Sequence, residues 1–333
     1  MIWGCATQVG EQGRWQQLEN NPSCVVWNAY PNPNDTMTWS GACANGKAQG
    51  RGTQVWRYLK DGKWEENEYA GEMKDGKRHG RGVLVAANGG RYEGNFNDGK
   101  RHGRGVLVWA NGDRYDGDWK DGNLNGRGVL MTAKGRYEGE FKDGKQHGRG
   151  VLVFANGDRY EGEYRDGEEH GRGVLVWANG NRYEGEFRDG KEHGRAVFVW
   201  VSGSRYEGDY RDGEEHGRGV YVWANGNRYE GDYRDGEEHG RGVYVWANGN
   251  RYEGDYRDGK RNGRGVYMWA NGDRYEGDWK DGKLNGRGVR VWTNGDKCEG
   301  DWREGLLVGT GEGLRNGQIA KCYDDGGEIK FTQ

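Results

Sequence analysis

Apolar and polar positions alternate with a period of two along most of the chain. Within residues 229–233 (YEGDY), tyrosine and glycine alternate with acidic residues, and within residues 241–246 (RGVYVW), glycine and aromatic residues alternate with arginine and valine. This period, with β-branched and aromatic residues, predicts β-strands. Asp235-Gly236 separates the two runs and Asn248-Gly249 follows the second. Because both dipeptides tolerate positive φ, they predict equally tight turns between antiparallel strands.

The hairpin so predicted is the unit of a repeat. Residues 206–228 are identical to residues 229–251, and the 23-residue pattern recurs with small changes from about residue 39 to about residue 311. A fixed period predicts an array of identical supersecondary units. Gly231 and Gly242 lack Cβ, so that the rings of Tyr229, Tyr233 and Trp246 are able to lie across the backbone. We expect an all-β, antiparallel meander of stacked hairpins.

The repeat motif YEG-x-aromatic-x-x-G-x-x-x-G-x-G resembles that of MORN (membrane occupation and recognition nexus) repeats, and this resemblance covers most of the chain. It implies an elongated, twisted antiparallel sheet of stacked 23-residue β-hairpins, in agreement with the pattern. Arrays of this family commonly self-associate, so that the resemblance also implies a homodimer as one alternative.

The two ends depart from the repeat. Residues 1–38 contain all three prolines and no repeat, and they predict an irregular N-terminal cap over the first sheet edge. Residues 39–312 are expected to form the array, of about 12 hairpins. The pattern fades afterwards, so residues 313–333 are interpreted as a C-terminal cap.

Composition favours a thin sheet over a globule. The chain has 66 glycines, 16 tryptophans and 20 tyrosines, and few aliphatic residues for its length of 333. No segment approaches the ~20 apolar residues that span a bilayer. No signal peptide is visible at the given start. Residues 2–5 (IWGC) faintly match a lipoprotein cleavage site, which would require a truncated start. The compartment is left open between cytoplasmic and exported.

All five cysteines lie near the ends of the chain. In an oxidising compartment, Cys24 with Cys43 and Cys298 with Cys322 could each fasten a cap to the neighbouring repeat. Cys5 would then be left without a partner. Reduced thiols in a cytosolic protein are the alternative, and the sequence leaves it open.

Charged residues vary from repeat to repeat around a net charge of −3. Repeats that begin at Tyr160, Tyr206 and Tyr229 carry Glu-Glu near the hairpin turn, which we interpret as solvated charge. No dense basic patch exists for nucleic acid. All seven histidines share one repeat position. Equivalent histidines in adjacent repeats would lie ~9–10 Å apart, which is too far for two of them to share a metal ion. We therefore predict that the histidines serve the turn, and no metal is expected.

Catalytic motifs are absent from the sequence. It contains no G-x-S-x-G, no H-E-x-x-H and no phosphate loop that opens a helix. A repeat array presents the same residues many times, whereas catalysis needs one constellation. We expect no enzyme activity and no cofactor.

The first functional hypothesis is a protein-interaction scaffold that binds a protein or peptide along two rows of aromatic residues. In the alternative, the two rows pack on each other as the cover of the sheet. The rows comprise Phe96, Trp119, Phe141, Tyr164, Phe187, Tyr210, Tyr233 and Tyr256, and Trp109, Phe154, Trp177, Trp200, Trp223, Trp246 and Trp269.

The second hypothesis is a peripheral membrane module that binds anionic lipid such as phosphoinositide, as the family name implies. Attraction to such a surface is worth ~1 kcal/mol per clustered basic residue. The best candidates are Lys77, Arg78, Lys100 and Arg101, although acidic residues are interleaved with basic ones throughout the repeats.

Overall fold

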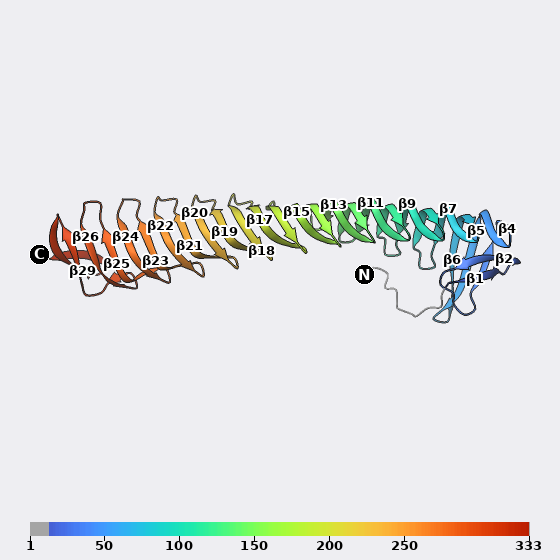
Figure 1. Ribbon diagram of the computed structural model, residues 1–333, viewed down its shortest axis with the longest axis horizontal. Helices are drawn as coiled ribbons and strands as arrows, with labels where there is room; N and C mark the ends of the chain where they lie inside the picture. The colour runs from blue at the N-terminus through green and yellow to red at the C-terminus, as the bar shows by residue number, and fades with distance from the viewer. Residues whose placement is uncertain (1–12, 333) are drawn as a thin grey trace. The chain divides into compact units, whose positions relative to one another are not determined.

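The structure, a computed structural model, describes residues 13–332 and divides into two compact units, residues 13–168 and residues 169–332. The described residues contain strands and turns and no helix (Figure 1). The predicted class, an all-β antiparallel meander of repeated hairpins, is confirmed. No helix in residues 13–332 has the length and apolarity that crossing a membrane would need.

Most strands of the first unit pair antiparallel with their neighbours along the chain. The exceptions lie near its N-terminal end: Thr36–Trp39 pairs antiparallel with Lys47–Lys60, and Val25 and Lys47 form one parallel bridge. Its strands are β1 (Arg14–Leu18), β2 (Asn21–Asn28), β3 (Thr36–Trp39), β4 (Ala42–Ala44), β5 (Lys47–Lys60), β6 (Lys63–Lys74), β7 (Lys77–Val85), β8 (Arg91–Asn97), β9 (Lys100–Val108), β10 (Arg114–Lys120), β11 (Asn123–Thr132), β12 (Gly135–Lys142), β13 (Lys145–Phe154) and β14 (Arg159–Arg165).

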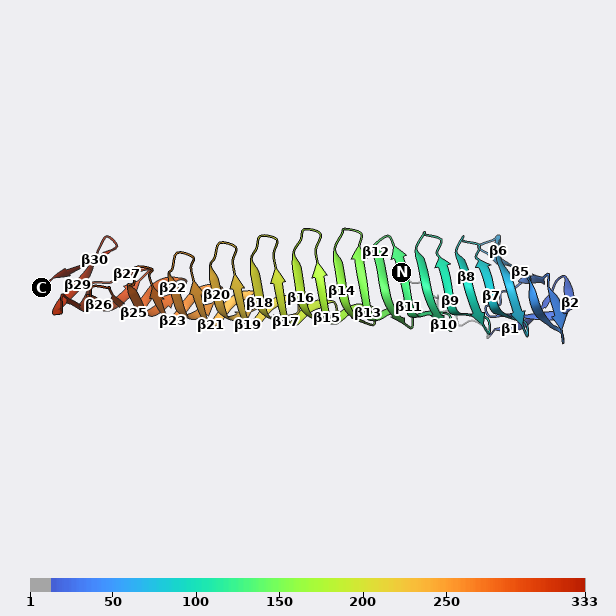
Figure 2. The ribbon, with the colours of Figure 1, turned by 90° about the horizontal axis from the view of Figure 1, so that it is seen from above.

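Most strands of the second unit follow one another side by side in chain order (Figure 2). Near its C-terminal end, Lys297–Arg303 pairs with both Leu306–Leu307 and Thr310–Arg315. They are β15 (Glu168–Val176), which begins at the boundary, β16 (Arg182–Arg188), β17 (Lys191–Val199), β18 (Arg205–Arg211), β19 (Glu214–Val222), β20 (Arg228–Arg234), β21 (Glu237–Val245), β22 (Arg251–Arg257), β23 (Lys260–Met268), β24 (Arg274–Lys280), β25 (Lys283–Val291), β26 (Lys297–Arg303), β27 (Leu306–Leu307), β28 (Thr310–Arg315), β29 (Gln318–Asp325) and β30 (Glu328–Thr332).

The turn inside each repeat has the predicted form. Asp235 and Gly236 have φ of 52° and 82°, and Arg234 pairs directly with Glu237 across the turn. Positive φ at both central residues is the geometry of a type I′ turn, whose twist matches the flanking strands. The same Asp-Gly geometry recurs in the other regular repeats, for example at Asp121 with Gly122.

The connection between repeats is longer than the sequence predicted. β21 ends at Val245 and β22 begins at Arg251. The Trp246 N–H donates to the Asn250 carbonyl at 2.9 Å, and the Gly249 N–H donates to the Trp246 carbonyl at 2.9 Å. Gly249 alone takes a positive φ, of 90°, within this connection. It is therefore a wider loop closed by one left-handed glycine, and the expectation of equally tight turns was wrong here.

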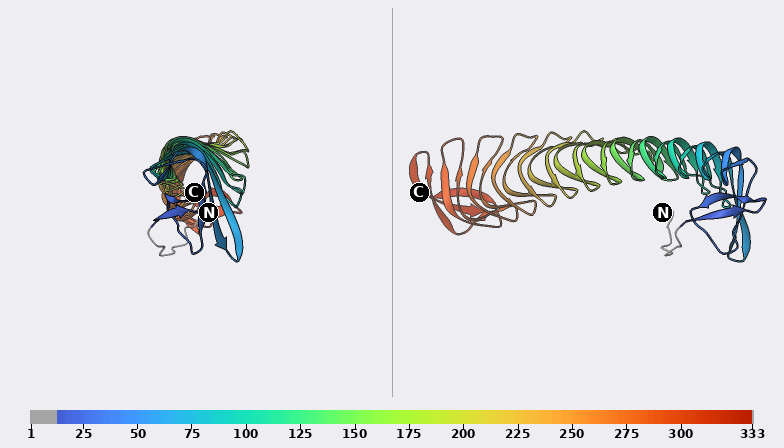
Figure 3. Two further views of the ribbon diagram at one scale, coloured as in Figure 1. Left: turned by 90° about the vertical axis from the view of Figure 1, so that its right-hand side faces the viewer. Right: turned by 45° about the vertical axis from the view of Figure 1, so that its right-hand side comes forward.

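A spine of tyrosines forms the core of each unit. Tyr229 is fully buried, and a Cβ added at Gly242 would lie 2.4 Å from its hydroxyl oxygen. The glycines therefore make room for the ring, as predicted. The ring meets Tyr233 and Tyr256 edge-on, with centroids 5.2 and 5.1 Å away. Each such pair adds ~0.5–1.5 kcal/mol to the energy of ring burial. The strands of each unit are strongly curved (Figure 3).

The histidines lie within strands, where the sequence predicted turn residues. His239 of β21 lies opposite Asp232 of β20, where the pairing register of the two strands shifts. The next residue, Gly240, has φ of 60°. This arrangement is a β-bulge, which uses a left-handed glycine to take up extra residues. Within residues 13–332, no three His, Cys, Asp or Glu side chains converge as metal ligands.

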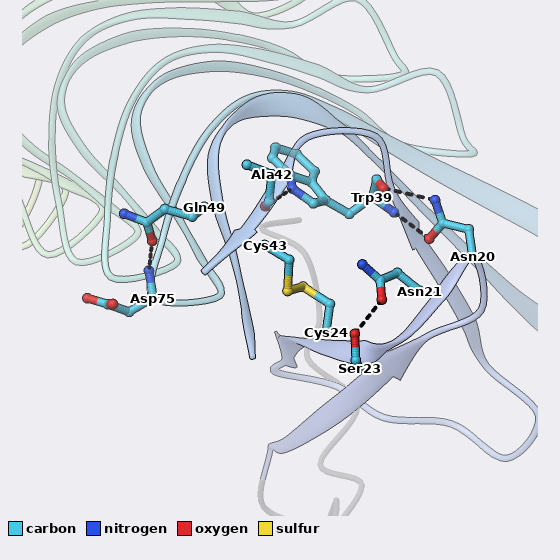
Figure 4. Close-up of a disulfide and its surroundings, with 9 residues drawn as sticks. All are labelled: Asn20, Asn21, Ser23, Cys24, Trp39, Ala42, Cys43, Gln49 and Asp75. Atoms are coloured by element: carbon cyan, nitrogen blue, oxygen red, sulfur yellow. Dashed lines mark hydrogen bonds between the residues drawn. A yellow bond between two sulfur atoms is a disulfide. The ribbon is translucent and has the colours of Figure 1, made fainter. Parts of the chain in front are cut away.

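The N-terminal end places a tryptophan where the repeats place a tyrosine. A Cβ at Gly41 or Gly52 would lie 2.6 or 2.7 Å from the Trp39 ring, so the ring covers that glycine pair. Cys24 and Cys43 form a disulfide that joins β2 to β4, with Cα atoms 6.0 Å apart (Figure 4). Cys5 and residues 2–5 lie outside the described residues.

At the C-terminal end, a disulfide takes the place of the tyrosine. Cys298 stands at the repeat's tyrosine position, is fully buried, and bonds to Cys322, with Cα atoms 6.0 Å apart. Leu307 fills the remaining space, because a Cβ at Gly300 would lie 2.6 Å from its Cδ1. The domain boundaries at residues 38 and 312 stay predictions.

Candidate interaction surface

The strand register gives each unit two distinct faces. Tyr229 lies opposite Tyr244, and Glu230 lies opposite Val243. Since side chains alternate along a strand, Tyr229, Tyr244 and Trp246 share one face, the tyrosine face. Glu230 and Val243 share the other, the valine face, where exposed ion pairs such as that of Arg228 with Glu230 recur in each repeat. Such exposed pairs contribute ~0–1 kcal/mol each.

The first predicted aromatic row belongs to the spine. Its members, from Phe96 to Tyr256, are between 4% and 7% exposed. Tyr233, for example, contacts Tyr206 at 5.3 Å and Tyr229 at 5.2 Å, edge-on in both cases. These rings pack on the spine tyrosines of their own chain, and not on the second row as in the alternative above, and they present little surface to a partner.

The second predicted row is half-buried, on the tyrosine face. In the second unit its tryptophans, each one residue past the end of a strand, alternate with aromatic residues two positions earlier in the chain, and together they form a continuous aromatic ladder. Centroids of successive rings are 4.2–5.3 Å apart. The aromatic ladder consists of Trp177, Phe198, Trp200, Tyr221, Trp223, Tyr244, Trp246, Tyr267 and Trp269.

In the first unit, the same register holds leucines. Leu107 and Leu152 precede Trp109 and Phe154 by two residues. The predicted row is therefore present there as single half-buried rings, and the aromatic ladder is a feature of the second unit.

An arginine ends the aromatic ladder. Arg290 stands at the repeat position of Tyr244 and Tyr267, and its guanidinium carbon lies 4.8 Å from the Trp269 ring and 5.0 Å from the Trp292 ring. Burial lowers the pKa of Arg290, an effect that Asp273 opposes. An arginine remains charged at neutral pH despite such a shift, so that this site holds a cation between two indoles.

A row of glutamates follows the aromatic ladder on the same face. The two-residue turn places Glu215 opposite Tyr210 and Glu238 opposite Tyr233, and Glu192 opposite Phe187. We call Glu192, Glu215 and Glu238 the glutamate row. All are half-buried, and burial raises the pKa of both Glu215 and Glu238. Within residues 13–332, no Lys, Arg or His nitrogen lies within 4.0 Å of these carboxylates.

Sequence reasoning missed the glutamate row, because the Glu-Glu pairs were interpreted as solvated turn charge. That holds for the first member of each pair, such as Glu237, which is exposed. The signal for the second member was available: an Asp-Gly turn of two residues fixes Glu238 opposite an aromatic residue of the buried face.

Two buried hydroxyl groups lie beside the glutamate row. Within the described part of the chain, the Tyr210 and Tyr233 hydroxyls have no hydrogen-bond partner. Burial raises the pKa of both tyrosines, and Glu215 and Glu238 raise it further. Where a tryptophan takes the same position, as at Trp279, its Nε1–H donates to a backbone carbonyl instead, that of Gly265 at 3.2 Å.

The predicted lipid-binding residues are mostly engaged within the chain. Lys77 pairs with Asp98 at 2.7 Å. Arg78 donates to the Gln54 side-chain oxygen at 3.2 Å and lies over the Tyr69 ring. The Arg101 guanidinium carbon lies 4.2 Å from the Trp119 ring, and the Arg101 Nη2 donates to the Gly122 carbonyl at 3.0 Å. Lys100 is exposed.

Two of the solved structures that match the chain are distant likenesses. The TCP domain of SAS-4 (dCPAP) of Drosophila melanogaster, in complex with a proline-rich motif of Ana2 (dSTIL), is 15% identical over 52% of this chain and 88% of that one, with a TM-score of 0.32. A streptogramin B lyase is 11% identical over 90% of this chain and 98% of that one, with a TM-score of 0.15. Neither likeness bears on fold or function at these TM-scores. No curated protein matches the chain.

The family comparison is specific. The MORN repeat profile matches eleven consecutive repeats, which begin at residue 69 and end at residue 312. The matched units, such as residues 206–228 and 229–251, coincide with the hairpins that place one spine tyrosine over one glycine pair. The chain therefore belongs to the MORN repeat family.

Proposed function

We propose that the chain is a non-catalytic scaffold that binds a protein or peptide partner along the aromatic ladder of its second unit. The observation that carries this proposal is the unbroken run of half-buried rings from Trp177 to Trp269. Tryptophan and tyrosine dominate the residues that contribute most to protein interfaces. The spine supplies the fully buried core, whereas the half-buried rings of the aromatic ladder keep exposed surface for a partner.

Two further points support the proposal. Repeat arrays of this family are generally scaffolds for protein or membrane interactions and are non-enzymatic. The tyrosine face also repeats the same groups at each step, which suits an extended partner that makes equivalent contacts along its length. No cofactor enters this account.

The test compares partner recovery by two variants of the full-length chain. Trp223→Ala with Trp246→Ala removes two rings of the aromatic ladder, and Val222→Thr with Val245→Thr changes the opposite face beside them. We expect cross-linking and mass spectrometry from source-cell extract to recover each specific partner at least tenfold less with the tryptophan variant. The valine variant should recover wild-type amounts.

Equal recovery by the two variants would overturn the proposal, provided that both keep the wild-type circular dichroism spectrum. Self-association is a further outcome that the same variants resolve. A dimer in analytical ultracentrifugation that the tryptophan variant lacks would identify a second copy of this chain as the occupant of the aromatic ladder.

A second candidate function, peripheral membrane binding, rests on the tip of the β5–β6 hairpin. Leu59 is 43% exposed and Trp64 is 61% exposed, and Lys60 and Lys63 flank the turn between them. Tryptophan beside lysine suits the boundary between lipid and water. Leu59→Ser with Trp64→Ser should then abolish co-sedimentation with phosphoinositide vesicles at near-physiological salt. Wild-type co-sedimentation of that variant, or none by the wild type, would remove this candidate.

A further inference from the structure

We propose that the partner segment held on the aromatic ladder is basic, and that its arginine side chains pair with Glu192, Glu215 and Glu238 in succession. This inference rests on the proposed function and adds the chemical class of the partner. It concerns the tyrosine face between residues 177 and 250, where the glutamate row and the aromatic ladder follow the same strands.

The first argument is the unmatched charge of the glutamate row. On the valine face, each repeat pairs its own charges, as Arg205 does with Glu207 at 2.5 Å. On the tyrosine face, within the described residues, the half-buried carboxylates of the glutamate row have no ion pair. A carboxylate that is partly removed from water without a cation is costly, and burial accordingly raises the pKa of Glu215 and Glu238. A cationic partner would relieve this cost.

The second argument is independent of the carboxylates. The hydroxyl groups of Tyr210 and Tyr233 are buried without a hydrogen-bond partner in the described chain, in side chains that are 6% and 7% exposed. Each tyrosine lies directly opposite one member of the glutamate row. Buried polar groups in proteins are nearly always satisfied, so these hydroxyls mark a place where a further polar group is missing. A guanidinium, with five donors, is able to reach carboxylate and phenol together.

The third argument is an internal precedent for the guanidinium. Arg261 occupies the register of Glu238 one repeat further on, and its guanidinium carbon lies 4.5 Å from the Trp279 ring and 5.5 Å from the Tyr267 ring. Arg290 lies between two indoles in the same way. This face therefore accommodates arginine over its aromatic rings. These two arginines also limit a basic segment to the stretch that contains the glutamate row, because they would repel it beyond that stretch.

The fourth argument is spacing. Equivalent positions in successive repeats are two strands apart, or about 9.6 Å. In a polyproline II segment, which has three residues per turn and rises 3.1 Å per residue, every third residue returns to the same face at about 9.3 Å. In a helix, every seventh residue recurs at about 10.5 Å. A segment with arginine at either interval presents its arginines on one face, at nearly the spacing of the glutamate row.

Two labelled peptides test the inference on the full-length chain. One is (Arg-Leu-Ser)6, for a segment in the polyproline II conformation, and the other is a helical peptide with arginine at every seventh position. We expect at least one to bind in fluorescence anisotropy at near-physiological salt. The same peptide with glutamine in place of arginine should bind at least tenfold more weakly.

A matched pair of variants separates the glutamate row from general charge. Glu192→Gln, Glu215→Gln and Glu238→Gln together neutralise the row. Glu168→Gln, Glu214→Gln and Glu237→Gln remove the same charge from exposed turn positions. We expect the row variant to weaken arginine-peptide binding at least tenfold and the turn variant to weaken it less than twofold.

Three results would overturn the inference: no binding of either arginine peptide, equal loss in both variants, or equal binding of the glutamine peptide. These results leave the proposed function standing if the Trp223→Ala and Trp246→Ala variant still loses its cellular partners. If that variant loses none, the proposed function fails as well, so that the two failures are distinguishable.

Discussion

At the scale of single residues, the two glycines beneath each spine tyrosine are not equivalent. A Cβ at Gly231 would lie 2.6 Å from the Gly242 Cα and 2.7 Å from the Arg241 carbonyl oxygen, both backbone atoms. The three atoms nearest to a Cβ at Gly242 all belong to the Tyr229 side chain. The chain itself uses this difference: Ala196 occupies the second glycine position of its repeat. The Tyr183 ring there is tilted 70° to Phe187, against 84° for Tyr229 to Tyr233.

We therefore predict that Gly231→Ala destabilises the second unit by about 3 kcal/mol and Gly242→Ala by about 1 kcal/mol. The backbone has to separate in the first case, whereas the ring only tilts in the second. Hydrogen exchange of β20 and β21, which reports local opening, is the measurement. Equal loss of protection in the two variants would show that the ring, and not the backbone, sets the requirement for glycine.

Tyrosine burial also predicts how stability depends on alkaline pH. Burial raises the pKa of Tyr69 and of Tyr92 to about 12, from about 10 in an unfolded chain. The stability that this shift represents, up to about 2–3 kcal/mol per ring, is fully present below pH 10. It is lost as the pH rises from 10 through 12, because only the unfolded chain ionises readily there.

The expected result is that phenolate absorbance and loss of the circular dichroism signal rise together between pH 10 and 12. Spine ionisation that clearly precedes loss of structure would contradict the account.

At the scale of the strand pair, the sequence allowed prediction of the hairpin but not of which aromatic row would be buried. Asp235-Gly236 and the alternation around it determine strand, turn and register. Tyr233 and Trp246 share the tyrosine face, so alternation alone does not rank them. Their burial differs because Tyr233 lies between two spine rings, Tyr206 and Tyr229, whereas Trp246 borders the loop between repeats. This ranking depends on contacts between repeats, which one repeat does not reveal.

The same scale includes the disulfide that replaces a spine tyrosine. Cys298 and Cys322 close a loop with a sequence separation of 24, so the bond should contribute about 3 kcal/mol. We predict that Cys298→Ser with Cys322→Ser increases hydrogen exchange in β26, β28 and β29, with little change in β1 to β4. Cys24→Ser with Cys43→Ser should show the reverse pattern. If the first variant left exchange in β28 and β29 unchanged, Leu307 packing would be sufficient to hold that end.

At the scale of the whole chain, one register position changes its charge from repeat to repeat while the fold of the repeat stays constant. This position is occupied by Arg78 and Arg101 in early repeats, by Glu192, Glu215 and Glu238 in later ones, and then by Arg261. Arg78 lies opposite Met73, and the other side chains lie opposite a spine ring. Since the hairpin tolerates either sign there, the choice of glutamate is not required by folding. It is a property that the array is free to use for recognition.

Deleting one copy of the duplicated repeat separates the role of the fold from that of recognition. Removal of residues 206–228 rejoins identical sequence at both ends, so Tyr183 would contact Tyr233 as it now contacts Tyr210 at 5.4 Å. We therefore predict a cooperative thermal transition close to that of the wild type. The deletion also removes Glu215, Tyr221 and Trp223, and the arginine peptide should bind about tenfold more weakly because one charge-assisted contact is lost.

The matched control is deletion of residues 92–114, a repeat of equal length that contains no member of the glutamate row or the aromatic ladder. It should cost similar stability and leave peptide affinity unchanged. Insertion of a third copy of residues 229–251 should instead strengthen binding of a peptide long enough to reach it, since each repeat adds one carboxylate at the same spacing. Affinity that ignored the number of glutamate repeats would mean that the segment is held at a single position, and that the length of the array serves another purpose.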